Sequence, residues 1–383
     1  MINVLVVVGS MGVGGNERFV LNLVKFLNRK EFNIDLLIYS DDGLNQEFYE
    51  QAKSNVRCLY LLQHKNENKY KALIRELLYT RKLVKEKSYD IIHCNSCSLL
   101  GLLRTVVPVK ICSTAKIIAH SHNSGNENGK LINKLARGFL KLILSCSIDV
   151  GFTCSDLAGR SKYTEKFMNT SRYIVINNAV ECEKYDFNAK IREELRTEID
   201  ADSDTIVLGS VGRMDDQKNQ EFLLDIVYKM KKRGIKVKLI VVGDGYKRES
   251  ITEKIKELDL FKDVYLLGVR QDVNELYNMM DVFMLPSLYE GFPFVLIEAQ
   301  LNGLPCIVSD TVSRTVDVIN NIIFLPLDVS HDNWIDAIKA SNKNRLDKSR
   351  LMIIREKYDV SKEIEKISKI YKKLLRPNRK ITL

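Results

Sequence analysis

The chain has 383 residues, and its 59 Lys and Arg against 49 Asp and Glu give a formal charge of +10. A chain of this length corresponds to two domains of roughly 100–200 residues each. Its composition, 45% hydrophobic and 28% charged, excludes an intrinsically disordered protein. No uncharged apolar run approaches the ~18 residues that a membrane-spanning helix needs. The positive surplus favours an anionic partner, which a nucleotide, a nucleic acid or an anionic lipid would all supply.

The N-terminal stretch MINVLVVVGS has no basic segment before its apolar run and no small-residue cleavage site. We therefore expect no export signal. Eight cysteines in a chain of this length are too few for a disulfide scaffold and suit a reducing compartment. Both observations predict a cytoplasmic protein.

Short apolar runs alternate with amphipathic stretches through the first half of the chain. The runs predict strands at residues 3–8, 34–39, 57–62, 89–93, 116–119, 148–153 and 173–176. Most are separated by residues with helical spacing, such as Phe19, Leu23, Phe26 and Leu27. Strands that alternate with helices in this way predict a doubly wound parallel sheet.

The same pattern starts again in the second half, with predicted strands at 206–211, 237–242, 264–267, 282–285 and 306–309. Predicted helices cover 191–199, 220–232 and 248–258. The chain is therefore expected to be an α/β protein with two Rossmann-like domains, joined near residues 180–185. We place the domains at 1–182 and 183–360, followed by a C-terminal helix within 361–383.

A glycine-rich segment, G-S-M-G-V-G-G at residues 9–15, follows the first predicted strand and leads into a helix. Glycines at such a place let backbone amides approach a phosphate at the helix N-terminus. The spacing differs from the G-x-G-x-x-G of dinucleotide folds. A tight turn without a ligand therefore stays open as an alternative.

Two cations flank the loop that follows the first strand of the second domain. Arg213 and Lys218 lie in the segment G-R-M-D-D-Q-K, at the edge where open α/β sheets place their ligands. The pair suits a diphosphate, and only Asp215 and Asp216 stand out as carboxylate partners. The alternative is an ordinary solvated loop.

The segment Y-E-G-F-P-F-V-L-I-E-A follows the predicted strand at 282–285. Pro293 fits the first turn of a helix, which puts Glu290 in the loop and Glu298 within the helix among apolar neighbours. A carboxylate there needs a partner, and two vicinal sugar hydroxyls would supply one. The alternative is a glutamate on the helix surface.

Together these segments resemble glycosyltransferase family 4. The resemblance covers essentially the whole chain and rests on the glycine loop, on G-R-x(4)-K at 212–218, on Gly243-Asp-Gly245 and on E-x(7)-E from Glu290 to Glu298. It implies a GT-B fold of two facing Rossmann-like domains, with a C-terminal helix that crosses back to the first. It also implies retaining sugar transfer, with the acceptor on the N-terminal domain and the nucleotide sugar on the C-terminal one.

The resemblance also assigns the site. Glu290 would meet the donor sugar, Glu298 would hold the nucleotide ribose, and Arg213 with Lys218 would bind the diphosphate. The remaining donor-binding positions would be Gly14, Gly15, Gly243, Gly245, Gly291 and Phe292. Such enzymes need no metal for the diphosphate, so we expect no cofactor, and we interpret Asp200-Ala-Asp202 as a solvated loop.

A histidine pair follows the fifth predicted strand, in I-I-A-H-S-H-N-S at 117–124. Members of the family carry a His just past this strand, near the donor sugar and the acceptor. His122 lies farther past the strand end than His120, so it is our catalytic candidate, acting on a reacting hydroxyl. His120 stays open as that residue or as a structural one. The His-Ser-His-Asn form resembles the branch that builds capsular and other surface polysaccharides.

A basic amphipathic segment at 130–144 places four cations on one helical face: Lys130, Lys134, Arg137 and Lys141. Apolar residues fill much of the rest, which is typical of a helix that lies on an anionic membrane surface. The alternative is a helix that covers the sheet and exposes a solvated basic face.

The sequence therefore predicts a hexosyl- or N-acetylhexosaminyltransferase peripheral to the inner face of the plasma membrane. Its donor would be a nucleotide diphosphate sugar, UDP by family habit, and its acceptor a lipid-diphosphate-linked saccharide in surface polysaccharide synthesis. The alternatives are a UDP-N-acetylglucosamine epimerase and an inactive saccharide-binding subunit. A nucleic-acid binder is disfavoured, because no helix-turn-helix, zinc finger or aromatic stacking platform is recognisable.

Overall fold

The computed structural model describes residues 1–12, 14–62, 68–122, 131–290, 292–341 and 345–376. The chain divides into two compact units: unit 1 comprises Met1–Ala179 and Val360–Leu383, and unit 2 comprises Val180–Asp359. The sequence placed the corresponding boundaries after residues 182 and 360. The C-terminal helix therefore belongs to unit 1, although it follows unit 2 in the sequence.

Unit 1 contains a seven-stranded parallel sheet in the order β3-β2-β1-β4-β5-β6-β7. Its strands are β1 (Ile2–Val8), β2 (Phe32–Ile38), β3 (Cys58–Leu61), β4 (Ile91–Ser96), β5 (Lys116–Ser121), β6 (Val150–Thr153) and β7 (Tyr173–Val175). Its helices are α1 (Gly15–Phe26), α2 (Gln46–Ser54), α3 (Lys69–Glu86), α4 (Leu99–Cys112), α5 (Leu131–Ser147), α6 (Asp156–Lys162), α7 (Glu165–Met168) and α15 (Val360–Leu374).

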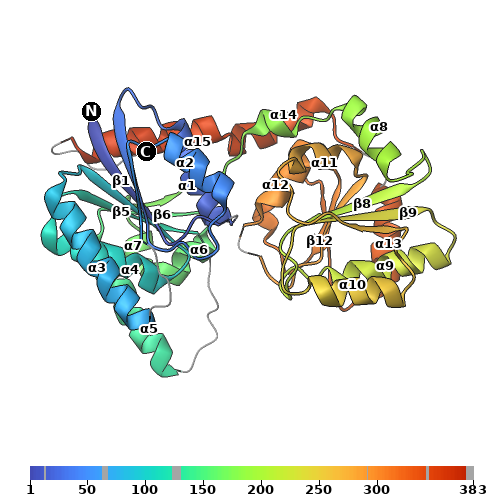
Figure 1. Cartoon of the computed structure of the whole chain (residues 1–383), viewed down its shortest axis with the longest axis horizontal. Helices are drawn as coiled ribbons and strands as arrows, with labels where there is room; N and C mark the ends of the chain where they lie inside the picture. The colour runs from blue at the N-terminus through green and yellow to red at the C-terminus, as the bar shows by residue number, and fades with distance from the viewer. Residues whose placement is uncertain (13, 63–67, 123–130, 291, 342–344, 377–383) are drawn as a thin grey trace. The chain divides into compact units, whose positions relative to one another are not determined.

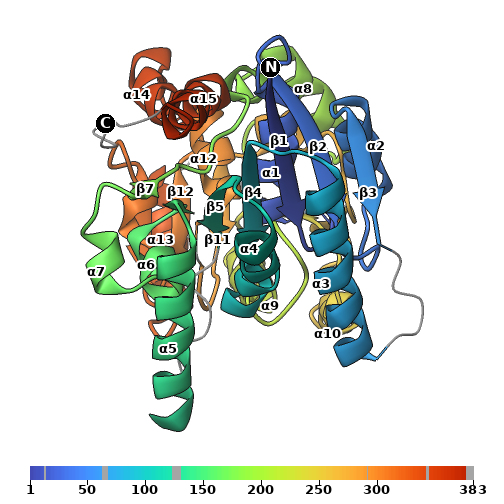
Figure 2. The same ribbon diagram turned by 90° about the vertical axis from the view of Figure 1, so that its left-hand side faces the viewer.

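Helices cover both faces of this sheet (Figures 1 and 2). The core on one face joins the sheet to α1, α2 and α15, and the core on the other face joins it to α3, α4 and α5. The central strands are buried along most of their length, for example at Val4–Val8 in β1. Parallel sheets need this double cover, which is why their strands are continuous apolar runs in the sequence.

Unit 2 repeats the plan with a six-stranded parallel sheet in the order β10-β9-β8-β11-β12-β13. The strands are β8 (Ile206–Val211), β9 (Val237–Val242), β10 (Val264–Leu266), β11 (Val282–Leu285), β12 (Cys306–Ser309) and β13 (Ile322–Leu325). The α-helices are α8 (Ala189–Glu198), α9 (Glu221–Lys232), α10 (Arg248–Glu257), α11 (Val273–Met279), α12 (Phe294–Leu301), α13 (His331–Ser341) and α14 (Lys348–Tyr358). Two short 3₁₀ helices are η1 (Cys182–Tyr185) and η2 (Arg314–Val316).

The predicted fold class, α/β with two doubly wound parallel sheets, is confirmed. Every predicted strand is present within a few residues, and one strand, β13, was not predicted. Its four apolar residues lie at the sheet edge between Asn321 and Pro326, so the run is too short to stand out from a buried loop.

Both sheets reverse their strand order next to the first strand, between β1 and β4 in unit 1 and between β8 and β11 in unit 2. Loops leave the carboxyl ends of neighbouring strands in opposite directions at such a switch point. This opens the crevice in which doubly wound sheets bind ligands. The switch points therefore mark where a site is expected in each unit.

The C-terminal helix α15 packs on unit 1 through one apolar stripe. Ile364, Ile367, Ile370 and Tyr371 are buried against the core that α1 also joins. The Glu363 carboxylate accepts a 2.7 Å hydrogen bond from the backbone N–H of Asn177. The predicted return of this helix to the first domain is thus confirmed for the residues that the structure describes.

Candidate donor and acceptor sites

In unit 2, the loops after β8 and β9 touch backbone to backbone. The N–H of Met214 donates to Asp244 O at 3.0 Å, and the N–H of Lys247 donates to Met214 O at 3.0 Å. A Cβ on Gly243 would lie 2.0 Å from Gly212 O, and one on Gly245 would lie 2.2 Å from Met214 O. Gly243 also has a φ of 131°. These two glycines therefore allow the loops to meet, and a contact of their own with a donor stays a prediction.

The loops after β8 and β11 meet across the switch point of unit 2. Lys218 Nζ donates to Glu290 Oε1 at 2.6 Å, and Ser287 Oγ donates to the same oxygen at 2.7 Å. Asn219 Nδ2 donates to Pro286 O at 3.2 Å, which ties the two loops together. The structure thus brings together two residues that the sequence assigned to one site, 72 positions apart.

The charged groups of the β8 loop pair differently from the expectation. The sequence suggested only Asp215 and Asp216 as partners for the cations, but Lys218 pairs with Glu290. Asp215 lies 3.3 Å from Arg213, whose side chain is 69% exposed. Asp216 instead accepts a hydrogen bond from Tyr246 OH and forms an ion pair with Lys247. These two contacts hold the pKa of the Asp216 carboxyl below its usual value.

Glu298 is 1% exposed within α12, which excludes the alternative of a helix-surface glutamate. Tyr185 OH donates to its Oε1 at 3.0 Å, and Tyr277 OH donates to its Oε2 at 2.9 Å. Each carboxylate oxygen of Glu298 thus accepts a hydrogen bond from a tyrosine hydroxyl. The expected need for buried partners is met by two tyrosines, and the contact with a ribose stays a prediction.

The residues between the two glutamates begin α12. Gly291 lies outside the described residues, and Pro293 precedes the first helical residue, Phe294. The Phe292 ring packs against Phe294 and Tyr358, with ring centroids 6.4 and 5.6 Å away. Phe292 therefore contributes to the core of unit 2, and its donor contact stays a prediction.

In unit 1, the glycine loop leads into α1 as the sequence indicated. Gly14 is the N-cap and makes no side-chain cap bond, and Gly15 is the first helical residue. A Cβ on Gly14 would lie 2.4 Å from Glu17 Oε2, so the first-turn carboxylate folds back against this glycine. An acid at a helix N-terminus is stabilised by the helix dipole. An incoming phosphate would therefore compete with Glu17.

Three histidines stack inside unit 1: His93 lies within β4, His120 near the carboxyl end of β5, and His122 just past that end. The His120 ring lies 5.5 Å from the His93 ring and 3.9 Å from the His122 ring, between centroids. His93 Nδ1 is hydrogen-bonded to Tyr371 OH at 2.6 Å, and His122 Nε2 to Asn95 Oδ1 at 3.0 Å. The two ends of the stack are thus held, while His120 makes no side-chain hydrogen bond within the described part of the chain.

Burial governs the protonation of this histidine stack. It lowers the pKa of His93 and of His122 to about 3 and lowers that of His120 well below the usual value. All three imidazoles are therefore neutral at pH 7. His93 and His120 are wholly buried, whereas His122 is 9% exposed, so His122 is the member with access to solvent.

The structure describes the side chains of two of the four cations of the basic segment, Arg137 and Lys141, and their contact with a membrane stays a prediction. Lys130 and the side chain of Lys134 lie outside the described residues. Lys141 Nζ donates to Arg160 O at 2.6 Å, and Arg137 is half-buried, so both are engaged beside α6. The outward stripe of α5 is instead apolar, and we call Leu135, Phe139 and Leu142 the α5 stripe.

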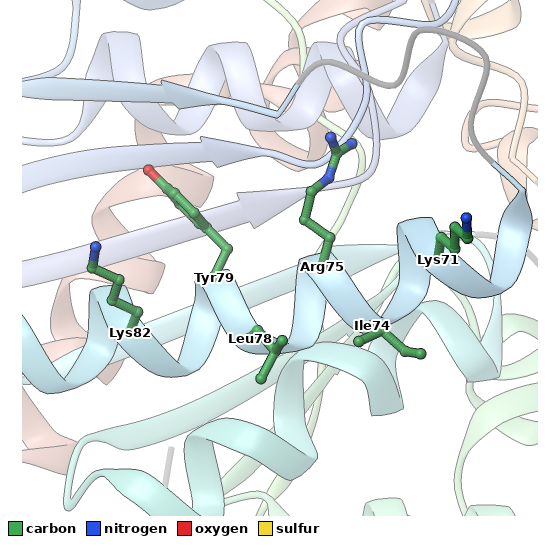
Figure 3. A pocket seen from close by; sticks show the side chains of 6 residues that line it. All are labelled: Lys71, Ile74, Arg75, Leu78, Tyr79 and Lys82. Atoms are coloured by element: carbon green, nitrogen blue, oxygen red, sulfur yellow. The ribbon is translucent and has the colours of Figure 1, made fainter.

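A shallow hollow of about 430 Å³ lies on the outer surface of α3 (Figure 3). It is lined by Lys71, Ile74, Arg75, Leu78, Tyr79 and Lys82, none of which was a predicted site residue. Ile74 and Leu78 are exposed beside these cations. Exposed apolar side chains therefore also occur on α3, which covers the same face of the sheet as α5, and there they lie beside cations.

No group of three or more His, Cys, Asp or Glu side chains could hold a metal ion in the part of the chain that the structure describes. Asp202, in the D-x-D segment, pairs with Lys236 at 2.5 Å. Metal independence itself stays a prediction. None of the described helices is both long and apolar enough to cross a bilayer.

Sequence reasoning missed the residues that hold the predicted ones. Ser287 bonds Glu290, Asn95 bonds His122, and Tyr277 bonds Glu298. Asn95 carried a signal that was not used, because a polar residue at the end of an otherwise apolar buried strand needs a partner. The two others are unremarkable in the sequence.

Comparison with known proteins identifies the class. The family model "Glycosyltransferase Family 4" matches residues 13–184, and "Glycosyl transferases group 1" matches residues 191–360, so the two together span most of the chain. The chain belongs to this family of two-domain glycosyltransferases, as the motifs indicated.

Individual relatives agree with this assignment. EpsF of Bacillus subtilis strain 168, named as a glycosyltransferase, is 29% identical over 82% of this chain and 80% of its own. An Escherichia coli UDP-Gal:alpha-D-GlcNAc-diphosphoundecaprenol alpha-1,3-galactosyltransferase is 26% identical over 94% of both chains. The solved structure of Anabaena HepE with UDP and glucose has a TM-score of 0.76 at 16% identity, over 97% of this chain and 100% of that one. This last likeness concerns the fold alone, and it confirms the GT-B class.

Proposed function

We propose that this glycosyltransferase transfers a hexose or N-acetylhexosamine from a UDP-sugar to a lipid-diphosphate-linked saccharide, with retention of the anomeric configuration. The observation that carries the proposal is the Lys218–Glu290 pair at the switch point of unit 2, with Arg213 exposed beside it. The names of the E. coli galactosyltransferase and of the UDP complex of HepE support this donor and acceptor. The process would be the synthesis of capsular or another surface polysaccharide.

The pairing pattern divides the donor chemistry among three residues. Among the described residues, the largely exposed Arg213 side chain pairs with Asp215 alone. Surface ion pairs are worth about 0–1 kcal/mol, so Arg213 can turn to a diphosphate at small cost. The Lys218 ammonium has three hydrogens and gives one to Glu290, which leaves others for a phosphate oxygen. Glu290, fixed by Lys218 and Ser287, is then a rigid acceptor for sugar hydroxyls.

Retention fits a leaving diphosphate that is stabilised by fixed cations. As the glycosidic bond breaks, negative charge develops on the diphosphate, and Arg213 with Lys218 would stabilise it electrostatically. An acceptor hydroxyl could then attack on the face that the diphosphate leaves. We propose that unit 1 supplies the acceptor side and that His122 orients this hydroxyl.

The test is UDP binding by calorimetry. Lys218→Ala should weaken UDP binding roughly ten- to hundredfold, the equivalent of one charge-assisted bond. Lys254→Ala is the matched control, because Lys254 forms a comparable 2.8 Å pair with Asp225 in the same unit. Equal UDP affinity in both variants would refute the assignment. A screen of nucleotide sugars for thermal stabilisation would then identify the donor.

Turnover assays separate the proposal from its alternatives. A retaining transferase consumes the UDP-sugar only with an acceptor and forms an α-linked product from an α-linked donor. Sugar epimerisation without an acceptor would indicate the epimerase, and UDP binding without any turnover would indicate an inactive saccharide-binding subunit. Activity should survive EDTA, and strict dependence on a divalent cation would contradict the cofactor-free proposal.

We also propose that unit 1 docks on an anionic membrane surface through the face that carries α3, α4 and α5. On this face Phe139, Ile111 and Leu78 are exposed, and Lys71 and Lys82 lie beside Leu78. Apolar side chains can insert among the headgroups, and each Lys or Arg near an anionic surface adds about 1 kcal/mol. Such docking would place the protein at the inner face of the plasma membrane, where a lipid-linked acceptor resides.

A further inference from the structure

Asn95 has a side-chain amide whose orientation is fixed by its surroundings. Its Nδ2 lies 3.4 Å from Val7 O and 3.3 Å from His93 O, and its Oδ1 lies 3.0 Å from His122 Nε2. Backbone carbonyls only accept hydrogen bonds, so the NH₂ group must face them. The amide oxygen is therefore the atom that faces His122.

This orientation determines the tautomer of His122. Because Asn95 Oδ1 can only accept, the hydrogen of a neutral His122 must reside on Nε2. Burial lowers the pKa of His122 to about 3, so the ring is neutral at pH 7. The second nitrogen, Nδ1, is then a bare acceptor.

His122 Nδ1 is buried and has no hydrogen-bond partner in the described ranges. An acceptor left in this state costs free energy, so a ligand that donates to it gains affinity and a defined orientation. His93 and His120 also carry unpaired nitrogens, but both rings are wholly buried. Among these three residues, only His122 has any exposed surface, 9% of the residue, although its Nδ1 atom is covered in this structure.

We propose that Asn95 is a positioning residue, which holds His122 in the Nε2–H tautomer so that Nδ1 accepts a hydrogen bond from a hydroxyl of the acceptor saccharide. The proposal rests on the function proposed above. The proposal fixes the direction of the hydrogen bond: the acceptor hydroxyl donates to Nδ1 of His122, and the oxygen lone pairs of the hydroxyl stay free to attack the sugar. The opposite tautomer would present an N–H to that hydroxyl and would occupy a lone pair instead.

The direct test is nitrogen NMR on protein labelled with ¹⁵N at histidine, since the chain has only five histidines. The His122 signals are assigned by their loss in His122→Asn. We expect wild-type His122 to show a protonated Nε2 and a bare Nδ1 at pH 7, and Asn95→Leu to show a mixture of both forms. A protonated Nδ1 in the wild type would overturn the proposal.

Kinetics provide the functional test, with Asn22→Leu as the control. Asn22 is also a buried asparagine of unit 1, but its Nδ2 donates to Ala179 O at 3.0 Å and no hydrogen bond joins it to His122 within the described residues. Asn95→Leu should lower kcat roughly tenfold or more without changing the KM of the nucleotide sugar, because the proposed hydrogen bond of His122 is to the acceptor and not to the donor. An equal loss of kcat in both variants would reduce Asn95 to a structural role.

A second pair of variants asks which nitrogen acts. An Asn side chain at position 122 places its amide near the Nδ1 position, whereas a Gln side chain reaches the Nε2 position. His122→Asn should therefore retain more of kcat than His122→Gln, and the reverse order would contradict the proposal. The NMR result is independent of turnover, so it tests the tautomer even if no nucleotide sugar is transferred, an outcome that would refute the proposed function instead.

Discussion

Glu290 is a carboxylate held entirely by donors from two loops. Its charge is balanced by Lys218, and its side chain is 7% exposed. Glu290→Gln removes the charge but keeps the shape, which releases Lys218 for a phosphate. We expect the UDP dissociation constant to stay within about twofold of the wild-type value or to improve, and turnover of the nucleotide sugar to fall, since a defined acceptor for sugar hydroxyls is lost. Calorimetry and a turnover assay measure the two effects.

The opposite result would be informative for the same residue. If Glu290→Gln weakened UDP binding as much as Lys218→Ala does, the carboxylate would serve to position the lysine rather than the sugar.

Two roles for Glu298 can be distinguished by experiment: binding of the ribose of UDP, and stabilisation of the fold of unit 2. If it holds the ribose, Glu298→Gln weakens the binding of free UDP and barely changes the melting temperature, because Tyr185 and Tyr277 can also accept hydrogen bonds from an amide. If it is structural, the melting temperature falls and UDP affinity is unchanged. We expect the first outcome, and differential scanning fluorimetry with and without UDP distinguishes the two.

At the scale of single residues, the sequence predicts which side chains are charged but not which side chains they contact. Lys218 and Glu290 were placed in one site by a motif resemblance, whereas their ion pair depends on β8 and β11 being neighbours in the sheet. Asn95 and His122 are brought together in the same way, because β4 pairs with β5. Strand order is a property of the whole sheet, so no local pattern contains these contacts.

At the scale of elements, the apolar runs predicted nearly every strand, because a parallel sheet covered on both faces leaves a continuous signal. The exposure of α5 was harder to predict. Its positive charges indicated a basic face, and the structure adds that Lys141 donates to a backbone oxygen of α6 and that the α5 stripe is exposed. A helix has several candidate faces, and the packing of its neighbours decides which one is covered.

The α5 stripe gives a prediction with a close control. Phe139→Ser should lower the binding constant for anionic liposomes roughly thirtyfold, as measured by sedimentation, because an inserted Phe contributes about 2 kcal/mol. Phe261→Ser, on unit 2, removes an aromatic ring of similar exposure, 59% against 65%, and should leave binding unchanged. Release at high salt would reveal the electrostatic share of the binding. Equal sedimentation of both variants would show that α5 only covers the sheet.

At the scale of the whole molecule, the two units should respond differently to acid. The pKa of an unfolded histidine is about 6.5, whereas burial lowers the pKa of His93 and His122 to about 3 in the folded state. Between these values the unfolded state binds more protons. The contribution of each buried neutral histidine to the free energy of unfolding of unit 1 is therefore complete above about pH 6.5. It is lost as the pH falls towards 3, by up to about 1.4 kcal/mol per pH unit for each ring.

The single tryptophan, Trp334, is buried in unit 2 and so reports on that unit. Denaturant unfolding is followed at pH 7 and at pH 5 by circular dichroism, which reports on both units, and by tryptophan fluorescence, which reports on unit 2. At pH 5 we expect part of the change in circular dichroism to occur at a lower denaturant concentration than the change in fluorescence. His120→Leu should reduce this separation, because His120 makes no side-chain hydrogen bond within the described ranges and its replacement removes mainly a protonation site. Coincident transitions at pH 5 in the wild type would contradict the prediction.

The position of α15 in the sequence has a consequence for folding during synthesis. Its residues are synthesised after unit 2, yet they complete unit 1, most of which is synthesised before unit 2. On a ribosome, unit 2 is contiguous and can close as soon as it emerges, whereas unit 1 waits without the apolar stripe of α15 and without the hydroxyl of Tyr371 for His93. The usual order, in which N-terminal domains finish first, is therefore reversed. A released chain that ended at residue 359 would carry a complete second unit behind a first unit that lacks α15.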